Sequence, residues 1–326
     1  MSLHKIPLLV PDTFAKAIYI VTGLCVLTPF ISAPLALCSG IILAFLISNP
    51  FENLTRKYTK KLLALSIIGL GAGMNLKEVL QTGIQGLYLS AMTIAVTIFF
   101  GIALYKIIKT DRDICVLITI GTAICGGSAI AAIAPVIKAN DRHITVALAI
   151  IFILNALALF TFPWLGHIFA LSEPQFGIWS ALAIHDTSSI IGAGMVYGPQ
   201  ALETATTIKL VRTLWIIPIV LITAYIYSRN KLTSEKRGVP IPWFIGGFLM
   251  MAALVTWLPG LQSTGLVIEQ VARRLLVLTL FLIGTGLTVT NLKNVGLRPF
   301  VLGILLWLII AGATLAFIKT GYAALL

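Results

Sequence analysis

The sequence predicts an all-α polytopic membrane protein, and three observations carry this prediction. Hydrophobic residues make up 59% of the 326 residues, against roughly 45–50% in soluble domains. Charged residues make up only 10%, where a soluble chain carries about 25%. The apolar runs are long and continuous rather than alternating, which favours membrane helices over a membrane β-barrel. This composition excludes a soluble globular enzyme, a disordered chain and a coiled coil.

Eleven apolar segments are candidates for helices that cross or enter the bilayer. A helix needs about 20 residues to cross a hydrocarbon core of roughly 30 Å. The connections between segments are short, so we expect a single transmembrane domain over residues 1–326 with about nine to eleven transmembrane segments. The candidate segments are 14–31, 33–48, 60–76, 83–106, 114–137, 143–169, 174–197, 204–228, 240–258, 272–290 and 297–318.

Basic residues gather in the loops, and the net charge of the chain is +12. Loops 51–61, 106–112 and 229–237 are rich in Lys and Arg, which places them on the cytoplasmic side. Basic charge in so apolar a chain faces anionic lipid rather than nucleic acid. We therefore expect the lipid bilayer as a partner and no nucleic acid.

Two further loops bear on the path of the chain through the membrane. Loop 138–142 is basic, whereas loop 170–174 contains Glu173 and no Lys or Arg. Both loops obey the charge rule if segments 114–137 and 174–197 enter the membrane and return to the side from which they came. Two full crossings are the alternative.

Two pairs of segments resemble each other within the chain. Residues 60–73 align with 273–286 at five identical positions of 14, and 123–130 resembles 183–190. By the count of predicted spans, the two members of the first pair cross the membrane in opposite directions. Inverted repeats of this kind are typical of secondary transporters. We therefore expect related segments at about 60–169 and 174–318.

The middle of segment 114–137 reads Cys125-Gly126-Gly127-Ser128. Paired glycines weaken a helix by about 1 kcal/mol each and let the backbone approach a ligand. Ser128 can cap a new helix start, whose free N–H groups attract an anion. These four residues are candidate substrate ligands; a close helix–helix contact through small residues is the alternative.

Segment 174–197 carries His185-Asp186-Thr187-Ser188-Ser189. A charged Asp at membrane depth costs roughly 2.5–3.5 kcal/mol, so we expect Asp186 to face a wet cavity or a partner. His185 and Asp186 are candidates to carry a coupling proton or help bind Na⁺. The hydroxyls of Thr187, Ser188 and Ser189 are candidate substrate ligands. The alternative is a structural hydrogen-bonded pair of His185 and Asp186.

Segment 204–228 places Lys209 and Arg212 on one helix face. Two cations inside an apolar span are expensive, and Arg suits bidentate binding of an oxyanion. We interpret both as charge compensation for a substrate anion. The alternatives are snorkelling to an interface or pairing with Asp186 or Glu203.

Asn155 is a further polar residue inside a span, in segment 143–169, and a lesser candidate for ion coupling. The sequence contains no recognisable catalytic set, nucleotide-binding motif or metal-ligand spacing. We therefore expect no enzyme activity, no cofactor and no metal. The four cysteines lie in apolar stretches and read as small buried residues: Cys25, Cys38, Cys115 and Cys125.

The stretches 120–132, 183–194 and 209–212 resemble the YeiH-like family of bacterial inner-membrane proteins, which is designated as sulfate exporters. The resemblance covers nearly the whole chain, from about Ala15 to Ile318. It implies a multi-pass protein of the bacterial inner membrane that exports a sulfate-like anion. More remotely, 125–128 is similar to the crossing-helix region of bile-acid-type symporters and cation–proton antiporters. That likeness implies a core domain that moves against a scaffold.

The leading hypothesis is a secondary transporter that exports a small inorganic or organic anion, such as sulfate, by alternating access coupled to H⁺ or Na⁺. A cation–proton antiporter, with Asp186 as ion ligand and Lys209 as its charge partner, is the second hypothesis. A non-transporting membrane enzyme or sensor subunit is the third. The sequence leaves a homo-oligomer open.

Overall fold

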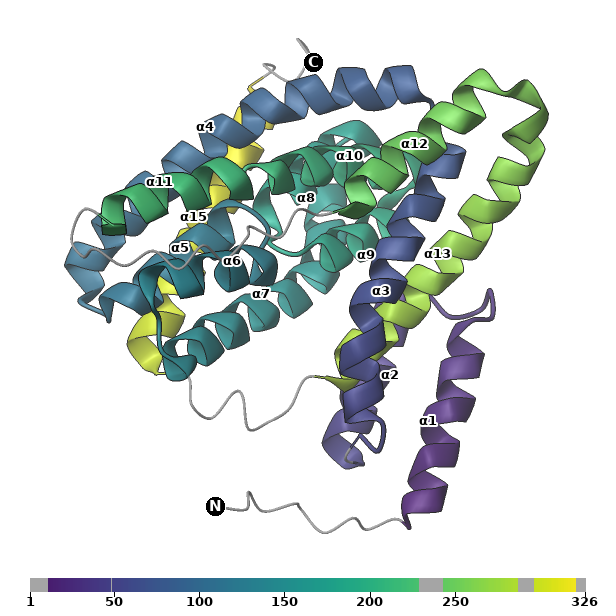
Figure 1. The fold of residues 1–326 in the computed structure, drawn as a ribbon, viewed down its shortest axis with the longest axis horizontal. Coiled ribbons are helices and arrows are strands. Elements are labelled where there is room, and N and C mark those ends of the chain that lie inside the picture. The colour runs from purple at the N-terminus through teal and green to yellow at the C-terminus, as the bar shows by residue number, and fades with distance from the viewer. Residues whose placement is uncertain (1–10, 48, 229–242, 287–295, 321–326) are drawn as a thin grey trace. The chain divides into compact units, whose positions relative to one another are not determined.

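A computed structural model describes residues 11–47, 49–228, 243–286 and 296–320. Every regular element within these ranges is helical, which confirms the predicted all-α class (Figure 1). The α-helices are α1 Asp12–Val26, α2 Ala33–Leu46, α3 Glu52–Leu70, α4 Leu76–Ile108, α5 Arg112–Ala123, α6 Gly127–Ile137, α7 Asp141–Ile168, α8 Glu173–Ala183, α9 Thr187–Tyr197, α10 Pro199–Leu214, α11 Ile216–Ser228, α12 Trp243–Trp257, α13 Gln262–Thr285 and α15 Leu297–Lys319.

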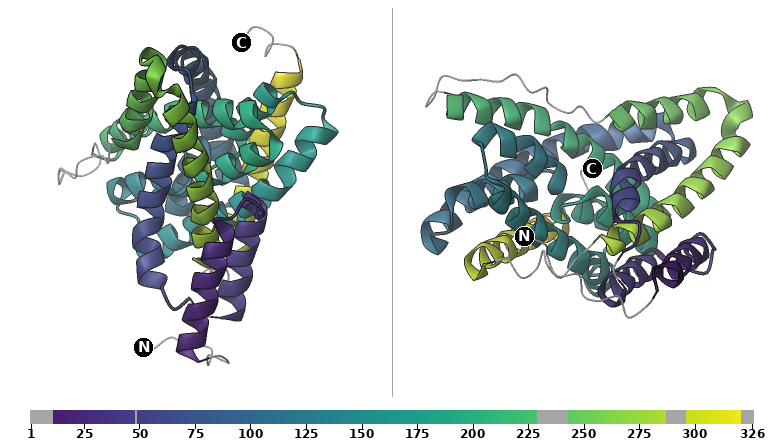
Figure 2. Two further views of the ribbon diagram at one scale, coloured as in Figure 1. Left: turned by 90° about the vertical axis from the view of Figure 1, so that its right-hand side faces the viewer. Right: turned by 60° about the horizontal axis from the view of Figure 1, so that its bottom comes forward.

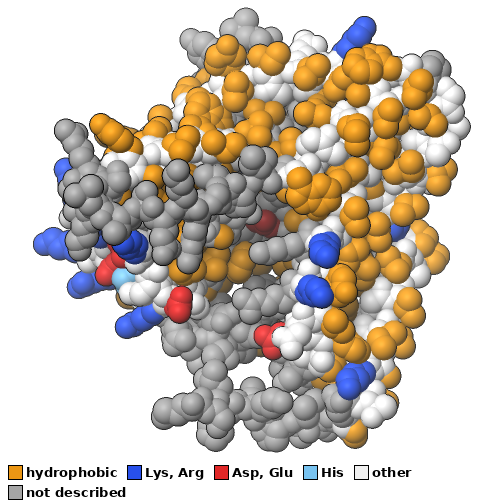
Figure 3. Space-filling model, viewed as in Figure 1, with side chains coloured by type: hydrophobic (Ala, Val, Ile, Leu, Met, Phe, Trp, Pro, Cys, Tyr) orange, Lys and Arg blue, Asp and Glu red, His pale blue; other side chains and the backbone are white. Residues whose placement is uncertain are grey.

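Four of these helical stretches are long and apolar enough to cross a membrane: Leu76–Ile108, Asp141–Ile168, Pro199–Tyr227 and Leu297–Lys319. Three shorter helices, α1, α2 and α12, are also apolar. Hydrophobic side chains cover much of the molecular face shown in Figure 3, as expected of a surface that lies in lipid. The prediction of a membrane protein is confirmed.

Helix boundaries differ from the predicted segments where polar residues continue a helix. α3 begins at Glu52 rather than at 60, and α13 begins at Gln262 rather than at 272. The early parts of both helices contain Lys, Arg, Gln or Glu, which are good helix formers although they are not apolar. A search for hydrophobic runs alone therefore misses these first turns.

The chain clusters into two compact units. Unit 1 comprises residues 1–76 and 244–290, and unit 2 comprises 77–243 and 291–326. The predicted repeat segment 60–169 thus contributes α3 to unit 1, and the segment 174–318 contributes α12 and α13. The single transmembrane domain stays a prediction.

Unit 1 is organised around α13, which packs against α2 and α3. α1 lies beside α2 (Figure 2). A Cβ atom added at Gly69 would lie 2.7 Å from the Ala272 side chain, whereas Gly73 lies against Glu269. Residue numbers rise along α3 as they fall along α13, so the two helices are antiparallel. This is the orientation that an inverted repeat requires; the repeat itself stays a prediction.

The crossing of α2 and α13 depends on two glycines. A Cβ atom on Gly40 would collide with the carbonyl oxygen of Phe281. A Cβ atom on Gly284 would lie 2.5 Å from the carbonyl oxygen of Leu37. Small residues at a membrane-helix crossing allow the two backbones to approach closely.

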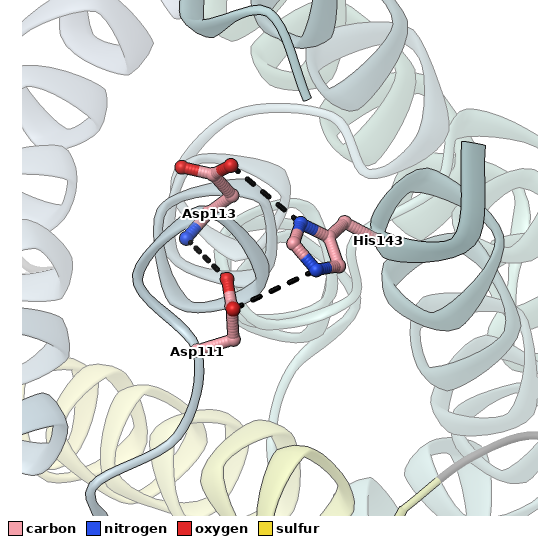
Figure 4. Close-up of side chains that lie close together, drawn as sticks. All are labelled: Asp111, Asp113 and His143. Carbon is pink, nitrogen blue, oxygen red and sulfur yellow. Dashed lines mark hydrogen bonds and ion pairs between the residues drawn. The ribbon is translucent and has the colours of Figure 1, made fainter. Parts of the chain in front are cut away.

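Unit 2 contains two helical hairpins, and the first is formed by α5 and α6. Asp111 and Asp113, where α5 begins, lie beside His143 at the start of α7 (Figure 4). The His143 Nε2–Asp111 Oδ2 distance is 3.6 Å, and the Nδ1–Asp113 Oδ2 distance is 3.5 Å. Since α7 follows α6 after a short turn at Lys138–Asn140, α6 returns to the end from which α5 started.

The second hairpin, formed by α8 and α9, also returns to its own start. The Glu173 carboxylate at the start of α8 accepts a 2.8 Å hydrogen bond from the Gln200 N–H, which follows α9. The hydroxyl of Tyr197 donates to the Leu171 carbonyl at 2.6 Å, and its ring stacks on Phe176. The two breaks predicted from the sequence are therefore confirmed, and each broken helix doubles back.

The two hairpins enter from opposite ends of α7. The first hairpin has its base at the start of α7, and the second at its end, where His167 stacks on Tyr197. α7 has 28 residues, which corresponds to about 42 Å at the helical rise per residue. Phe162 of α7 stacks on Trp179 of α8 with ring centroids 4.2 Å apart. The hairpins therefore point toward one another along α7.

Alanine at Gly40 is expected to destabilise the protein by about 1–3 kcal/mol, because the added methyl group forces α2 and α13 apart. The measurement is the melting temperature of the purified protein in detergent. Gly246→Ala is the matched control in unit 1, since no atom lies within 4 Å of a Cβ atom at that position. Equal melting temperatures for the two variants would contradict the close crossing.

Single cysteines at the hairpin bases test the doubled-back path. Arg112→Cys and Arg142→Cys should react with a membrane-impermeant maleimide from one side of the bilayer. Ser172→Cys and Gln200→Cys should react from the other side. The background carries Ser in place of Cys25 and Cys38, because Cys25 is exposed and Cys38 half-buried rather than buried as predicted. Labelling of positions 112 and 142 from opposite sides would instead show a full crossing.

Candidate functional site

The tip of the first hairpin lies between α5 and α6, where residues 124–126 leave the helical conformation. Gly126 adopts φ +65°, a conformation that L side chains rarely adopt. A Cβ atom there would lie 3.0 Å from the Ile151 side chain and 3.3 Å from the Cβ of His185. Glycine is therefore required both by the backbone angle and by the close approach of the second hairpin.

The tip of the second hairpin, His185 and Asp186, is bound to the middle of α7 through Asn155. The Oδ1 atom of Asn155 accepts the backbone N–H of His185 at 3.2 Å and that of Asp186 at 3.3 Å. Asn155 is buried and lies near the midpoint of α7. The two hairpin tips therefore meet at about half the length of the spanning helix.

Arg212 of α10 joins the ends of both first half-helices. Its Nε donates to the Ala123 carbonyl at 2.9 Å, and its Nη2 donates to the carbonyls of Ala123 and Thr122 at 2.6 and 3.2 Å. Its Nη1 donates to the carbonyls of Ala181, at 3.0 Å, and Leu182. These are the C-terminal carbonyls of α5 and α8, which have no partner within their own helices.

Lys209, one turn earlier on α10, completes this arrangement. Its ammonium donates to the carbonyl of Ile184 at 2.6 Å and to that of Ala181 at 3.4 Å. Both Lys209 and Arg212 have 0% exposed surface, so neither snorkels to an interface. A cation at a helix C-terminus also compensates the negative end of the helix dipole.

Lys209 and Arg212 were predicted to contact the substrate, but in the structure both side chains donate hydrogen bonds to backbone carbonyls. All five guanidinium N–H groups of Arg212 donate to backbone carbonyls. Arg212 therefore has no N–H left to ligate an anion directly in this conformation. Both cations lie at the C-terminal ends of α5 and α8, and their part in anion binding stays a prediction.

Several buried polar atoms around the hairpin tips have no hydrogen-bond partner in the described protein. They are Nδ1 and Nε2 of His185, Nδ2 of Asn155 and Oγ1 of Thr122. Buried polar groups in native proteins are nearly always satisfied, so atoms of this kind point to water or a ligand between them. The sequence pattern did not identify Thr122 as a candidate site residue, although it lies one turn before the glycine pair.

The second half-helices, α6 and α9, begin at these tips with their positive ends. Their N-cap residues, Gly126 and Asp186, form no side-chain cap, so the predicted capping of the new helix start by Ser128 is wrong. The Asp186 carboxylate instead accepts the hydroxyl of Ser188. Ser128 is exposed, Gly127 and Thr187 are half-buried, and Ser189 is buried. Part of the surface of Ser128, Gly127 and Thr187 therefore stays exposed, whereas Ser188 and Ser189 are enclosed by protein.

Cys125 is buried, unlike the exposed Ser128 of the same hairpin tip. It is buried in the apolar cluster of unit 2, together with residues of α5, α6 and α7. Its proposed contact with substrate stays a prediction, as do those of the neighbouring tip residues.

The fold and the site define a helical membrane protein with two opposed hairpins that meet at a polar centre. The chain belongs to the family described as conserved hypothetical protein 698, whose model matches residues 14–303. This is the family that the sequence motifs indicated.

Curated relatives are similar over nearly their whole length. A UPF0324 membrane protein of Bdellovibrio bacteriovorus is 48% identical over 94% of this chain and 95% of its own. A UPF0324 membrane protein of Vibrio vulnificus is 45% identical over 90% of this chain and 94% of its own. One of Bacteroides thetaiotaomicron is 44% identical over 94% and 92%, respectively. No solved structure matches the chain.

Replacement of Arg212 by Met is expected to cost about 3 kcal/mol or more, because the carbonyls of two helix ends lose their charged donor. Arg212→Lys should rescue little, since an ammonium cannot reproduce the planar fork that spans both ends. Melting temperature and yield of the purified protein measure the effect.

Arg142→Met is the matched control for that experiment. Arg142 is exposed at the start of α7, and surface substitutions usually change stability by about 0.5 kcal/mol or less. An Arg212→Met protein as stable as the control would show that the guanidinium does not hold the two hairpins.

Proposed function

We propose that this protein is a secondary transporter of a small anion, with its binding site where the two hairpin tips meet. The observation that carries the proposal is the meeting of two half-helix N-termini, α6 and α9, beside buried polar atoms that lack partners. Half-helix N-termini that point at an anionic group near the bilayer midplane are typical of secondary transporters.

Electrostatics favour an anion over a cation at these tips. The positive ends of α6 and α9 meet there, and a helix N-terminus favours an oxyanion because its first N–H groups have no partner within the helix. The opposing negative ends of α5 and α8 are compensated by Arg212 and Lys209. The positive helix ends therefore dominate the electrostatic potential at the hairpin tips, where Asp186 contributes the single carboxylate.

The proposed binding groups come from both tips. Backbone N–H groups of residues 127–128 and 187–189 would hold the anion, with the hydroxyls of Ser128 and Thr187, because the Gly126 N–H and the Ser188 hydroxyl already donate to Gly121 and Asp186. His185 and Asp186 would carry a coupling proton or bind a coupling ion. A sulfate-like substrate, export, and a location in the bacterial inner membrane belong to the same proposal, supported by the family resemblance.

Alternating access fits a site built on two hairpins. Movement of a repeat bundle against the remaining helices would expose the tips to each side in turn. Two accessible groups, Ser128 and Thr187, lie on different hairpins. A change in the packing around them would therefore open one tip or the other to water.

A cation–proton antiporter is the second candidate, and one observation favours it. The Asp186 carboxylate is half-buried at the hairpin tip and accepts the Ser188 hydroxyl. A carboxylate at membrane depth can ligate Na⁺ or carry a proton. Flux that follows Na⁺ and pH but not the anion would favour this candidate.

Flux of radiolabelled sulfate into proteoliposomes tests the anion proposal. Asn155→Leu should lower flux about tenfold or more, because the second tip loses its hydrogen bonds to α7 and its binding groups are displaced. Thr145→Val, at an exposed position of the same helix, should leave flux unchanged. Equal flux for the two variants would remove the tip from the transport path.

A further inference from the structure

The proposed function leaves the coupling ion open, and the hairpin carbonyls bear on this question. In transporters built from broken helices, half-helix C-terminal ends and unwound carbonyls coordinate the coupling Na⁺ or H⁺. The equivalent groups here are the carbonyls of Thr122 and Ala123 in the first hairpin and of Ala181, Leu182 and Ile184 in the second. Each of them accepts a hydrogen bond from Arg212 or Lys209.

We propose that Lys209 and Arg212 are built-in substitutes for coupling sodium ions, so that anion binding and movement at this site require no Na⁺. The inference rests on the proposed transport function and deepens it. Each cation occupies the position at a half-helix C-terminus where a free ion would otherwise be needed. The chain supplies these charges permanently, from one face of α10.

Geometry leaves a sodium ion few oxygen ligands at these ends. Arg212 spans both hairpins and uses all of its donors, and Lys209 closes the end of the second hairpin at Ile184. A sodium ion would have to displace one of these side chains to reach the same oxygens. Both side chains are fully enclosed, which leaves no solvent into which they could swing.

Electrostatic repulsion also disfavours a sodium ion at the ends of α5 and α8. Two like charges repel strongly in the low dielectric of a protein interior. A sodium ion at the end of α5 or α8 would lie beside Arg212, which cannot lose its proton, and near Lys209. A sodium site on Asp186, with the hydroxyl of Ser188, is the competing arrangement, and the experiment separates the two.

The first test measures melting temperature and does not depend on transport. The purified full-length protein is compared in NaCl, KCl and choline chloride at equal ionic strength. We expect the same melting temperature in all three salts. A higher value in NaCl that disappears in Asp186→Asn would reveal a sodium site at the tip and overturn the proposal.

Variants of Lys209 test whether the cation itself is needed. Lys209→Met keeps the length and apolar stem but removes the charge and the donors, so its melting temperature should fall by several degrees. Lys209→Arg should retain more of the wild-type value. Lys106→Met, at an exposed position near the end of α4, is the control. A Lys209→Met protein as stable as this control would overturn the proposal.

Sulfate flux into proteoliposomes is the second test of the proposal. Sulfate uptake into proteoliposomes should be equal in sodium and in choline buffer. Uptake that stops in choline buffer would overturn the inference while supporting transport. Absence of uptake in both buffers would contradict the transport function, and the salt comparison of melting temperature would still decide whether the site binds Na⁺.

Discussion

The free carbonyl groups at the ends of α5 and α8 are the constraint on which the rest of unit 2 depends. A helix that stops inside a membrane exposes its last carbonyls where no lipid can satisfy them. Arg212 solves this problem for both hairpins with one planar side chain, and Lys209 completes the second. Without these donors, the last carbonyls of both half-helices would lose the side-chain hydrogen bonds that satisfy them.

That arrangement also gives the buried cations a stable environment. A charge removed from water is costly unless it is paired and hydrogen-bonded. Here the compensation comes from backbone dipoles rather than from a carboxylate, since the negative ends of two helices converge on Arg212. The cation and the helix ends are therefore mutually dependent.

The spanning helix α7 sets the depth of the site. It receives the base of one hairpin at its start and of the other at its end, and Asn155 fixes the second tip near its midpoint. Gly126 lets the first tip approach that point. The positive ends of α6 and α9 thus lie beside buried polar atoms that have no hydrogen-bond partner in the described protein.

The helical class, the membrane setting and the position of both breaks could be predicted from the amino-acid sequence. Hydrophobic runs report the environment of each segment, and glycines or an aspartate inside such runs interrupt a helix locally. Charge in two short loops also favoured hairpins over full crossings. The sequence could also select Asn155, Lys209 and Arg212, because polar groups inside apolar spans are rare and expensive.

The contacts of those polar groups, in contrast, could be found only in the folded protein. Spacing along α10 indicated one face but not that it meets the carbonyl ends of two distant hairpins, because hydrogen-bond partners some 30 and 90 residues apart are set by packing. The sequence did not indicate Thr122, whose carbonyl accepts from Arg212 and whose hydroxyl has no partner, for the same reason. A local pattern records where a helix breaks, whereas the partner that satisfies the break depends on the whole fold.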